Sequence, residues 1–466
     1  MTAVDTAAPP VDVGRPRRRL ATPPGRLRLL SILVAAMLVA LWAAAFTTVR
    51  VRQHATHALA GTHVAAVVAA ESLRADLAAA DAAAARELLP GATVPAAVRP
   101  DPRTAYQRAV ADAGARIVEL ARVGHDAGAP GALTVLSQRL PEYAGQVELA
   151  RAYTRLGSTV GGAYLRSGSA LMRAALLPAA DRLVTAEAAR VDRDSRRASG
   201  ALGPLVVAAA GLVSVAMLVV VQIRLFRRTN RILNPALVAA TLLAAIAVGW
   251  ALTAFAVQRA HLLDARDQGF RPLTAAGQAR ALGLRAWADE NLALISPADA
   301  AAHDADADAA TLRLGYDPGG DLVTAADPAT GPTTGSAPPG LLAGLTVPAG
   351  LEGPAAPLGP VWQVHQTNAA QVRAHLDEPG GLPTALALLQ GPDTIAFHRF
   401  DQASAAVVAA ASGRLTGHLT QAGAPLRSLP AALSLSLGLA AVLTLVGIQV
   451  RINDYRQPRG HHPDGG

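Results

Sequence analysis

The sequence QIRLFRRTNRILNP, residues 222–235, separates two long apolar runs and decides how the chain is organised. It holds four arginines within eight positions and is too short to fold as a domain. The runs on either side, 201–223 and 236–257, contain no charged residue. A helix needs about 20 apolar residues to cross a hydrocarbon core of about 30 Å, so this pattern predicts two membrane spans joined by a short basic turn.

Two further uncharged runs, 29–49 and 428–448, are of similar length, and all four contain 21 to 23 residues. The composition agrees with a membrane protein, because 51% of the residues are hydrophobic and only 16% are charged. Aromatic residues make up only 3%, so alanine and leucine supply the apolar character, which favours helices over sheets. The predicted fold class is an all-α membrane protein with four transmembrane helices.

Arginines flank the predicted spans and set their predicted orientation. They lie before the first span, between the second and third, and after the fourth: Arg15, Arg17, Arg18, Arg19, Arg26, Arg28, Arg224, Arg227, Arg228, Arg231, Arg451, Arg456 and Arg459. Because basic residues of short loops stay inside, the tail 1–28, the linker 224–235 and the tail 449–466 are predicted to be cytoplasmic, with the protein in the plasma membrane. A cleaved signal peptide is the alternative for the first run, since the alanines at 43–45 mimic a cleavage site.

The two large segments, 50–200 and 258–427, are predicted to lie on the extracytoplasmic side. The cytoplasmic pieces have 28, 12 and 18 residues, which is too short for a kinase, cyclase or nucleotide-binding domain. Any action of this protein inside the cell therefore requires a partner.

An internal repeat relates the two halves of the chain. LWAAAFTTVRVRQHA (41–55) resembles GWALTAFAVQRAHLL (249–263), with a Trp in each span and Arg and His beyond its edge. VVVQIRLFRRTNR (219–231) likewise resembles VGIQVRINDYR (446–456). This duplication predicts that both extracytoplasmic segments share one architecture.

Helical patterns fill the first extracytoplasmic segment. Apolar residues follow a bundle-facing stripe at Tyr106, Val110, Ala113, Ile117 and Leu120. Gly- and Pro-rich breaks at 91–102, 127–131 and 156–159 delimit four helices, the first over about 51–89 and the last over about 159–197, with a kink expected at Pro178.

The predicted domains are thus two up-down four-helix bundles, and the second carries an insertion. Residues 315–360 contain DPGG, ADPATGPTTG and APPG, which predict a long irregular loop or a small cap. Helical patterns return at 361–376 and 393–419.

No motif for catalysis or for a cofactor occurs in the sequence. There is no cysteine, P-loop, HExxH or GxSxG, and the predicted spans contain no ionisable residue that a proton-coupled transporter needs. All the positive charge is arginine, without a basic patch interleaved with aromatics, so nucleic acid is not an expected partner. We predict no enzyme activity, no catalytic residue and no cofactor.

Histidines raise the question of a metal site. His54 and His57 lie one helical turn apart, and His261 occupies the matching place in the repeat. Since no carboxylate is spaced to complete a site with them, solvated polar residues are the favoured interpretation. The acidic run HDADAD (303–308, with Asp299 before it) lacks the glycine and terminal Glu of a calcium loop, so no metal is predicted there either.

The stretch LPEYAGQVELARAYTRLGSTVGGAYLRSGSALMRAALLPAAD, residues 140–181, is unusual in a chain built from Ala and Leu. It gathers arginines, tyrosines and glycines at Arg151, Arg155, Arg166, Tyr143, Tyr153, Tyr164, Gly145, Gly157, Gly161 and Gly162. Glycine in a helix costs about 1 kcal/mol relative to Ala, so these glycines predict close approach of a neighbouring backbone or of a ligand. Helix packing and a binding surface both remain open.

This stretch resembles the extracytoplasmic domain of GlnX-type membrane proteins of high-GC Gram-positive bacteria, and a looser similarity extends over the four spans. The resemblance implies a link between a GlnH-like solute-binding lipoprotein outside and a PknG-like soluble Ser/Thr kinase inside. It thus implies a non-enzymatic signal transducer for amino-acid status.

On this hypothesis the partner-binding residues form two groups. The outside group is Arg151, Tyr153, Arg155, Gly161, Gly162, Tyr164 and Arg166, and the inside group is Arg224, Arg227, Arg228 and Arg231. The inside arginines also suit anionic lipid headgroups. Direct binding of solute and a homodimer stay open, and the rival functions are an organiser of the cell envelope and, less favoured, a transporter subunit.

Overall fold

The computed structural model describes residues 23–89, 101–122, 129–229, 234–323, 340–342, 347 and 350–454, without the side chains of 23–28, 129–130, 225, 228–229 and 450–454. The chain divides into two compact units, which we call unit 1 and unit 2. Unit 1 comprises Met1–Ala55, Arg197–Ala260 and Ala422–Gly466, and unit 2 comprises Thr56–Arg196 and His261–Gln421.

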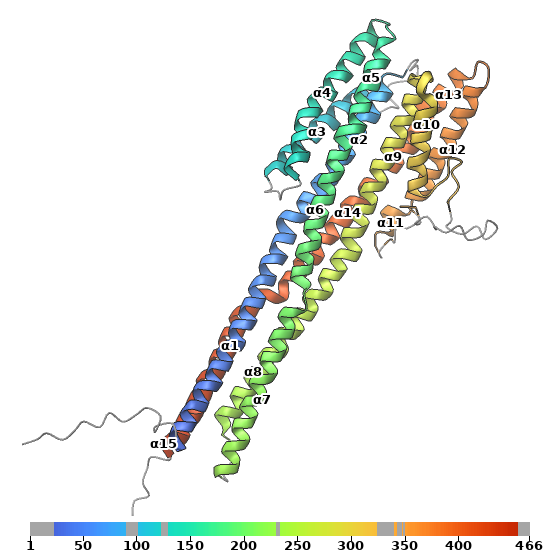
Figure 1. The fold of residues 1–466 in the computed structure, drawn as a ribbon. Helices are drawn as coiled ribbons and strands as arrows, with labels where there is room; N and C mark the ends of the chain where they lie inside the picture. The colour runs from blue at the N-terminus through green and yellow to red at the C-terminus, as the bar shows by residue number, and fades with distance from the viewer. Residues whose placement is uncertain are drawn as a thin grey trace, which may run out of the picture. The chain divides into compact units, whose positions relative to one another are not determined.

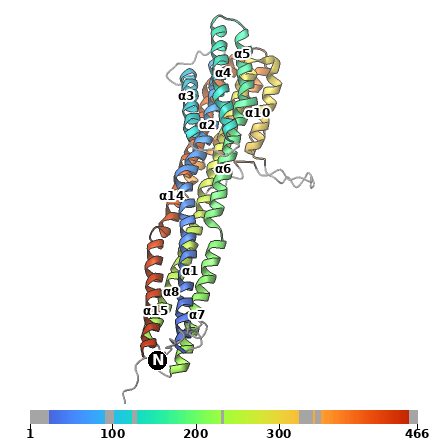
Figure 2. The same cartoon turned by 60° about the vertical axis from the view of Figure 1, so that its left-hand side comes forward.

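The described secondary structure is helical, apart from one isolated antiparallel bridge between Tyr316 and Leu322 (Figures 1 and 2). The long helices are α1 (Pro23–Ala58), α2 (Val64–Glu87), α3 (Pro102–Arg122), α4 (Ala129–Arg155), α5 (Val160–Leu171), α6 (Leu177–Ser199), α7 (Leu202–Thr229), α8 (Pro235–Asp264), α9 (Arg271–Ile295), α10 (Ala300–Leu314), α12 (Leu358–Asp377), α14 (Thr394–Arg427) and α15 (Leu429–Asp454). Shorter helices are α11 (Glu352–Ala355), α13 (Leu382–Leu388) and the 3-10 turn η6 (Pro297–Asp299). Within the described ranges the π-helical turns are η2 (Leu59–His63), η4 (Met172–Leu176), η5 (Ala265–Phe270) and η7 (Leu389–Asp393).

Four helical stretches are long and apolar enough to cross a membrane. They are Leu29–Glu87, Val160–Arg224, Pro235–Ile295 and Leu382–Gln449, and each contains one of the runs predicted from the sequence. The all-α class and the four candidate spans are thereby confirmed, and the chain is a multi-pass membrane protein by these criteria.

Unit 1 packs parts of α1, α7, α8 and α15 around an apolar core. In α1 the buried residues Val34, Leu38, Leu41 and Ala45 recur every three or four positions, which places them on one face of the helix. The opposite surface of the unit stays apolar: Leu212 of α7 is 72% exposed and Leu435 of α15 is 75% exposed. Large exposed leucines suit contact with lipid better than contact with water.

Side-chain hydrogen bonds join the helices and connecting segments of unit 1, and three of them illustrate this. Trp42 Nε1 donates to Ser434 Oγ at 3.0 Å, and Asn234 Nδ2 donates to the carbonyl of Gly447 at 2.8 Å. Arg52 NH1 donates to Gln258 Oε1 at 2.8 Å, and its guanidinium lies over the ring of Phe255. Each bond satisfies a polar group that an apolar environment would otherwise leave unpaired.

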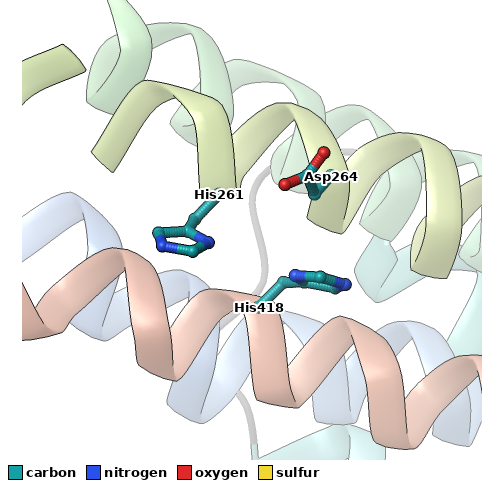
Figure 3. Close-up of side chains that lie close together, drawn as sticks. All are labelled: His261, Asp264 and His418. Carbon is teal, nitrogen blue, oxygen red and sulfur yellow. The ribbon is translucent and has the colours of Figure 1, made fainter. Parts of the chain in front are cut away.

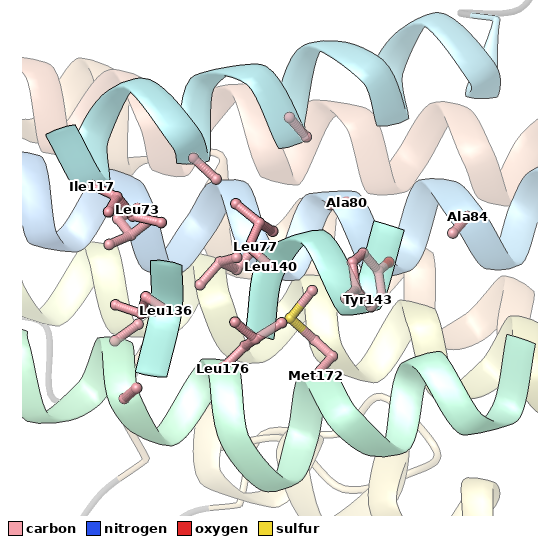
Figure 4. Close-up of a cluster of buried hydrophobic side chains, with 14 of the residues drawn as sticks. Leu73, Leu77, Ala80, Ala84, Ile117, Leu136, Leu140, Tyr143, Met172 and Leu176 are labelled. Carbon is pink, nitrogen blue, oxygen red and sulfur yellow. The ribbon is translucent and has the colours of Figure 1, made fainter. Parts of the chain in front are cut away.

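Helix α2 is the central element of unit 2 and is buried on all sides. Its sequence VAAVVAAESLRADLAAADAAAARE has no amphipathic pattern, as is usual for a helix buried on all sides, and its charged residues Glu71, Arg74 and Asp81 are buried as well. Leu73, Leu77 and Ala80 face a first core built with Tyr143 and Met172 (Figure 4). On its other side the alanines at 75, 78 and 82 belong to a second core with α9.

The first and second cores lie in one compact unit. The first is formed by α2, α3, α4, η4 and α6, and the second by α2, α9, α10, α12 and α14. The sequence predicts two separate bundles for these segments, but α2 of the first segment and α9 of the second contact each other along much of their length. Alanine makes this contact close, because it brings two backbones together without large side chains between them.

The predicted breaks coincide with helix ends. Helix α4 ends at Arg155 and Gly157 follows with a φ of 69°, a left-handed conformation that glycine adopts without strain. Before Pro178 the helix widens into the π turn Met172–Leu176, so the irregularity precedes the proline. In the predicted insertion, Gly315 ends α10 with a φ of 102°, and α11 and the start of α12 fall within it; 324–339, 343–346 and 348–349 lie outside the described residues.

Candidate functional site

A pocket of about 490 Å³ opens within unit 2, lined by residues of α2, α6, η5, α9 and α10. This volume lies in the range of about 300–1,000 Å³ that is usual for small-molecule sites. Its apolar lining includes Leu177, Val184, Phe270 and Leu282. No local sequence signal marks this set of residues, because its members come from five elements that only the fold brings together.

Charges of both signs line the pocket. Arg74 pairs with Glu71 on the same helix, and its NH1 lies 3.3 Å from Asp181 Oδ1 of α6. Arg285 and Arg313 add positive charge from α9 and α10. A pocket with guanidinium groups and carboxylates together suits a small solute that carries both a carboxylate and an ammonium group.

The two arginines from α9 and α10 are weakly engaged. The side chain of Arg285 has its closest carboxylates in Asp289 and Asp306, both at 3.9 Å, and its Nε is buried without a hydrogen-bond partner among the described residues. Arg313 is exposed. An unpaired buried N–H is costly, so a bound carboxylate at Arg285 would recover free energy.

Gly277 of α9 sets the distance between α9 and α2 beside the pocket. A Cβ atom at this position would lie 2.7 Å from Glu71 Oε2, closer than non-bonded atoms approach. Glycine therefore allows the buried Glu71 to sit between the two helices and to pair with Arg74.

A second polar cluster lies buried among the aromatic residues of the second core. His365 Nδ1 is 2.7 Å from Asp393 Oδ1, and its Nε2 is 3.3 Å from Glu290 Oε2. Burial alone would lower the pKa of His365, but the charges of Asp393 and Glu290 outweigh it and raise the pKa to about 10. His365 is thus a buried imidazolium that fastens α12 to α9 and η7.

Of the predicted outside contacts, Arg151 is buried and already engaged. It is 3% exposed, its Nε donates to Glu87 Oε2 at 2.8 Å, it pairs with Glu148, and its guanidinium lies 4.3 Å from the ring centre of Tyr106. Burial raises the pKa of Tyr106 to about 12, so its hydroxyl stays neutral beside this ion pair. Arg151 thereby holds α4 against α2 and α3.

Some of the other predicted outside contacts pack between α4 and α5, and others are exposed on the surface. Tyr153 and Tyr164 stack with ring centres 5.3 Å apart, which joins α4 to α5. Gly161 is buried, and a Cβ there would lie 2.8 Å from the carbonyl oxygen of Ala150. This glycine therefore allows α4 and α5 to pack closely. Arg155 is exposed at the end of α4.

Two more of these residues face the second half of unit 2. Arg166 NH1 lies 3.1 Å from Asp299 Oδ2, with both side chains partly exposed. Gly162 lies near Ile295, whose Cγ2 would be 3.7 Å from an added Cβ. The seven residues are therefore neighbours on α4 and α5, but they do not form one continuous exposed patch.

The predicted inside contacts are described only in part. Arg224 and Arg227 are exposed on α7. The side chain of Arg228, and Arg231 altogether, lie outside the described residues.

The acidic run 303–308 lies within helix α10, and its side chains point to different sides of the helix. His303 is buried against Asp289, with Nδ1 3.2 Å from Oδ1, while Asp308 pairs with Arg373 at 3.2 Å. The run thus supplies helix-to-helix ion pairs, and its sequence pattern gave no sign of the partners.

Residues 55–196 match the family model of the actinobacterial sensor domain. Neither the curated proteins nor the solved structures contain a match to the chain. The matched segment runs from the end of α1 to α6 and includes the stretch on which the resemblance to GlnX-type proteins rests. Together with the four candidate spans, it indicates that this is a bacterial membrane protein with a role in sensing, whose residues 55–196 are similar to actinobacterial sensor domains.

Proposed function

We propose that this protein is a non-enzymatic transmembrane signal transducer that relays extracytoplasmic amino-acid status to a cytoplasmic Ser/Thr kinase. The observation that carries the proposal is a sensor-like segment, 55–196, within a chain that has four candidate spans. The helical stretches Leu29–Glu87 and Val160–Arg224 each extend from this segment into a candidate span, and in the second stretch only Gly200 and Ala201 lie between α6 and α7. Packed helices of this kind switch between discrete arrangements, which is the physical basis of a relay.

On the proposed topology both termini and the 224–235 linker are cytoplasmic, and the two halves of unit 2 are extracytoplasmic. The exposed Arg224 and Arg227 then offer positive charge to an acidic surface of the kinase or to anionic headgroups. The short linker has no room for a catalytic domain, so the kinase itself supplies the enzymatic output.

Outside, the proposed partner is a solute-binding lipoprotein that docks on the end of the α4–α5 hairpin. Arg155 is exposed there, Leu156 is 79% exposed, and Val160 adds apolar surface at the start of α5. An exposed apolar centre with an arginine beside it is a common composition of protein interfaces. Arg151 supports this surface from within, through its pairs with Glu87 and Glu148.

Copurification of the full chain with the lipoprotein tests this docking. The full chain is required, because α2 shares a core with α9 and an isolated 55–196 segment would expose that face. Leu156→Asp and Arg155→Ala should reduce the captured lipoprotein several-fold, whereas Arg139→Ala, an exposed arginine of the same helix paired with Glu142, should not. Capture of no solute-binding protein by the wild type would refute the outside partner.

Cross-linking in cells from a photoreactive residue at Arg227 tests the cytoplasmic half. Capture of a soluble Ser/Thr kinase is expected, and it should weaken in an Arg224→Glu, Arg227→Glu variant. An envelope organiser would instead yield wall-assembly proteins, with a deletion strain altered in shape rather than in kinase output. Solute flux into vesicles containing only this chain would favour the transporter subunit.

Direct binding of solute is a second candidate, favoured by the charged pocket. Calorimetry with amino acids and the purified full chain should then give a signal that Arg285→Ala removes. Arg373→Ala should retain it, because Arg373 pairs with Asp308 and neither residue lines the pocket. Binding that appears only when the lipoprotein is present would assign recognition to the lipoprotein instead.

A further inference from the structure

Two histidines and an aspartate meet between α8 and α14. His261 and Asp264 lie one helical turn apart on α8, and His418 faces them from α14, as Figure 3 shows. A nitrogen from each histidine and a carboxylate oxygen of Asp264 all lie within 4.8 Å of one another. All three residues are partly buried and belong to unit 2.

The imidazole groups have unused nitrogen atoms. Among the described residues, neither His261 Nδ1 nor His418 Nδ1 has a hydrogen-bond partner, although both atoms are buried. Other histidines of unit 2 are engaged: His63 with Asp194, and His303 with Asp289. A buried polar atom without a partner carries a desolvation cost, which a ligand would remove.

Imidazole nitrogens with one carboxylate are the donor set of zinc, nickel, cobalt and copper rather than of magnesium or calcium. A tetrahedral zinc ion with bonds of about 2.1 Å keeps neighbouring ligand atoms about 3.4 Å apart, so side-chain rotations of about an ångström would close this site. Three protein ligands leave a fourth position for water, which the partial exposure of the site supplies.

A second group of metal-ligand residues, Glu290, His365 and Asp393, does not offer the same chemistry. Both nitrogens of His365 face carboxylates, at 2.7 Å and 3.3 Å, so its ring has no lone pair directed at an empty position. The positive charge of His365 neutralises part of the negative charge of Glu290 and Asp393, to which a cation would otherwise bind. The His261 group has no such internal partner among the described residues.

We propose that His261, Asp264 and His418 bind one divalent transition-metal cation, best matched by Zn²⁺, and that this ion joins α8 to α14. The two helices belong to the third and fourth candidate spanning stretches, Pro235–Ile295 and Leu382–Gln449. A bound ion would fix their separation and register at this level. The proposed relay does not require this ion, so the two proposals stand or fall separately.

The test uses the purified full chain in nanodiscs, stripped with a chelator and titrated with Zn²⁺ alone. Bound zinc per chain, measured by equilibrium dialysis and elemental analysis, should fall by one ion in His261→Ala and in His418→Ala. Loss of a supporting group alone typically costs 10–100-fold in metal affinity, so Asp264→Asn, which removes a direct ligand, should weaken binding about 10-fold or more. His54→Ala and His57→Ala, which remove exposed histidines of α1, should leave the count unchanged.

A Co²⁺ titration gives an independent readout, because tetrahedral Co²⁺ absorbs in the visible range and the band reports on its ligands. The band should appear in the wild type and vanish in His418→Ala, and circular dichroism of each variant checks that the helices persist. The proposal is overturned if the wild type binds no Zn²⁺, or if folded His261→Ala and His418→Ala variants keep the same zinc count and the same cobalt spectrum. Zinc bound at other residues, such as His461 and His462, would leave the zinc count and the cobalt spectrum unchanged in these two variants.

Discussion

The two cores of unit 2 reach stability by different means. The first core is built from alanines and leucines with two tyrosines, Tyr106 and Tyr143. The second core holds five aromatic residues, Trp287, Tyr316, Trp362, Phe397 and Phe400, and the rings of Trp362 and Phe397 contact the buried, charged His365. The first relies on close approach of helices and the second on large buried side chains, so substitutions of opposite kinds should be the costly ones in each.

The largest effect is expected from Trp362→Ala in the second core. Trp362 is fully buried, with ring centres of Phe400 and His365 at 4.8 Å and 4.9 Å. Its truncation should lower the free energy of unfolding by about 3–5 kcal/mol. Denaturant unfolding followed by tryptophan-independent circular dichroism measures the loss. Trp250→Ala, at a position 49% exposed in unit 1, serves as the control, and an equal loss in both would contradict the role given to the aromatic core.

The buried charge of the second core should make stability depend on pH. The folded pKa of His365 is raised to about 10 from an ordinary value of 6.5, so the proton stabilises the folded state. This contribution is complete below pH 6.5 and is lost as the pH rises from 6.5 through 10. Unfolding measured at intervals across this window should show the decline.

His365→Gln provides the matched comparison for that pH series, since glutamine does not titrate. Its free energy of unfolding should be lower near neutral pH and nearly flat from 6.5 to 10. A wild-type slope that persists in the variant would assign the pH dependence to other groups.

Overpacking should damage the first core. Ala80 of α2 is fully buried between helices, and Ala80→Leu would force neighbours apart at a cost of about 1–3 kcal/mol. Ala152→Leu, at an exposed position of α4, makes the same chemical change and should cost almost nothing. Thermal unfolding of both variants decides the matter, and a tolerated leucine at position 80 would mean that the first core is not closely packed.

Local signals predicted the helices, but long-range signals were missing. Uncharged runs and Gly/Pro breaks located the candidate spans and the ends of α3 and α4, because such signals act within a few residues. The burial of α2 on two sides was not predicted, since a run of alanines has no period that assigns it a neighbour. Arg151 was predicted as an outside contact because its partner Glu87 lies 64 residues earlier in the chain.

The candidate sites show the same limit. Asp264 follows His261 at the one-turn spacing of a helix, which is a local signal in the sequence, whereas His418 is distant in the chain and only the fold brings it near. His365 stood in a stretch predicted to be helical, but nothing local to it pointed to Asp393 or Glu290. Residues that meet across several helices become visible as a site only when the packing is known.

The smallest expected effect separates two glycines of the stretch 140–181. Gly161 faces α4 so closely that a Cβ would lie 2.8 Å from the carbonyl oxygen of Ala150, whereas nothing lies within 4 Å of a Cβ at Gly145. Gly161→Ala should lower the free energy of unfolding by about 1 kcal/mol net, because overpacking costs about 1–3 kcal/mol and helix propensity returns up to about 1 kcal/mol. Gly145→Ala meets no neighbour and should raise stability by about 0.4–1 kcal/mol. Thermal unfolding of the two variants side by side should therefore give shifts of opposite sign. Equal shifts would show that the first core does not depend on the close approach of α4 and α5.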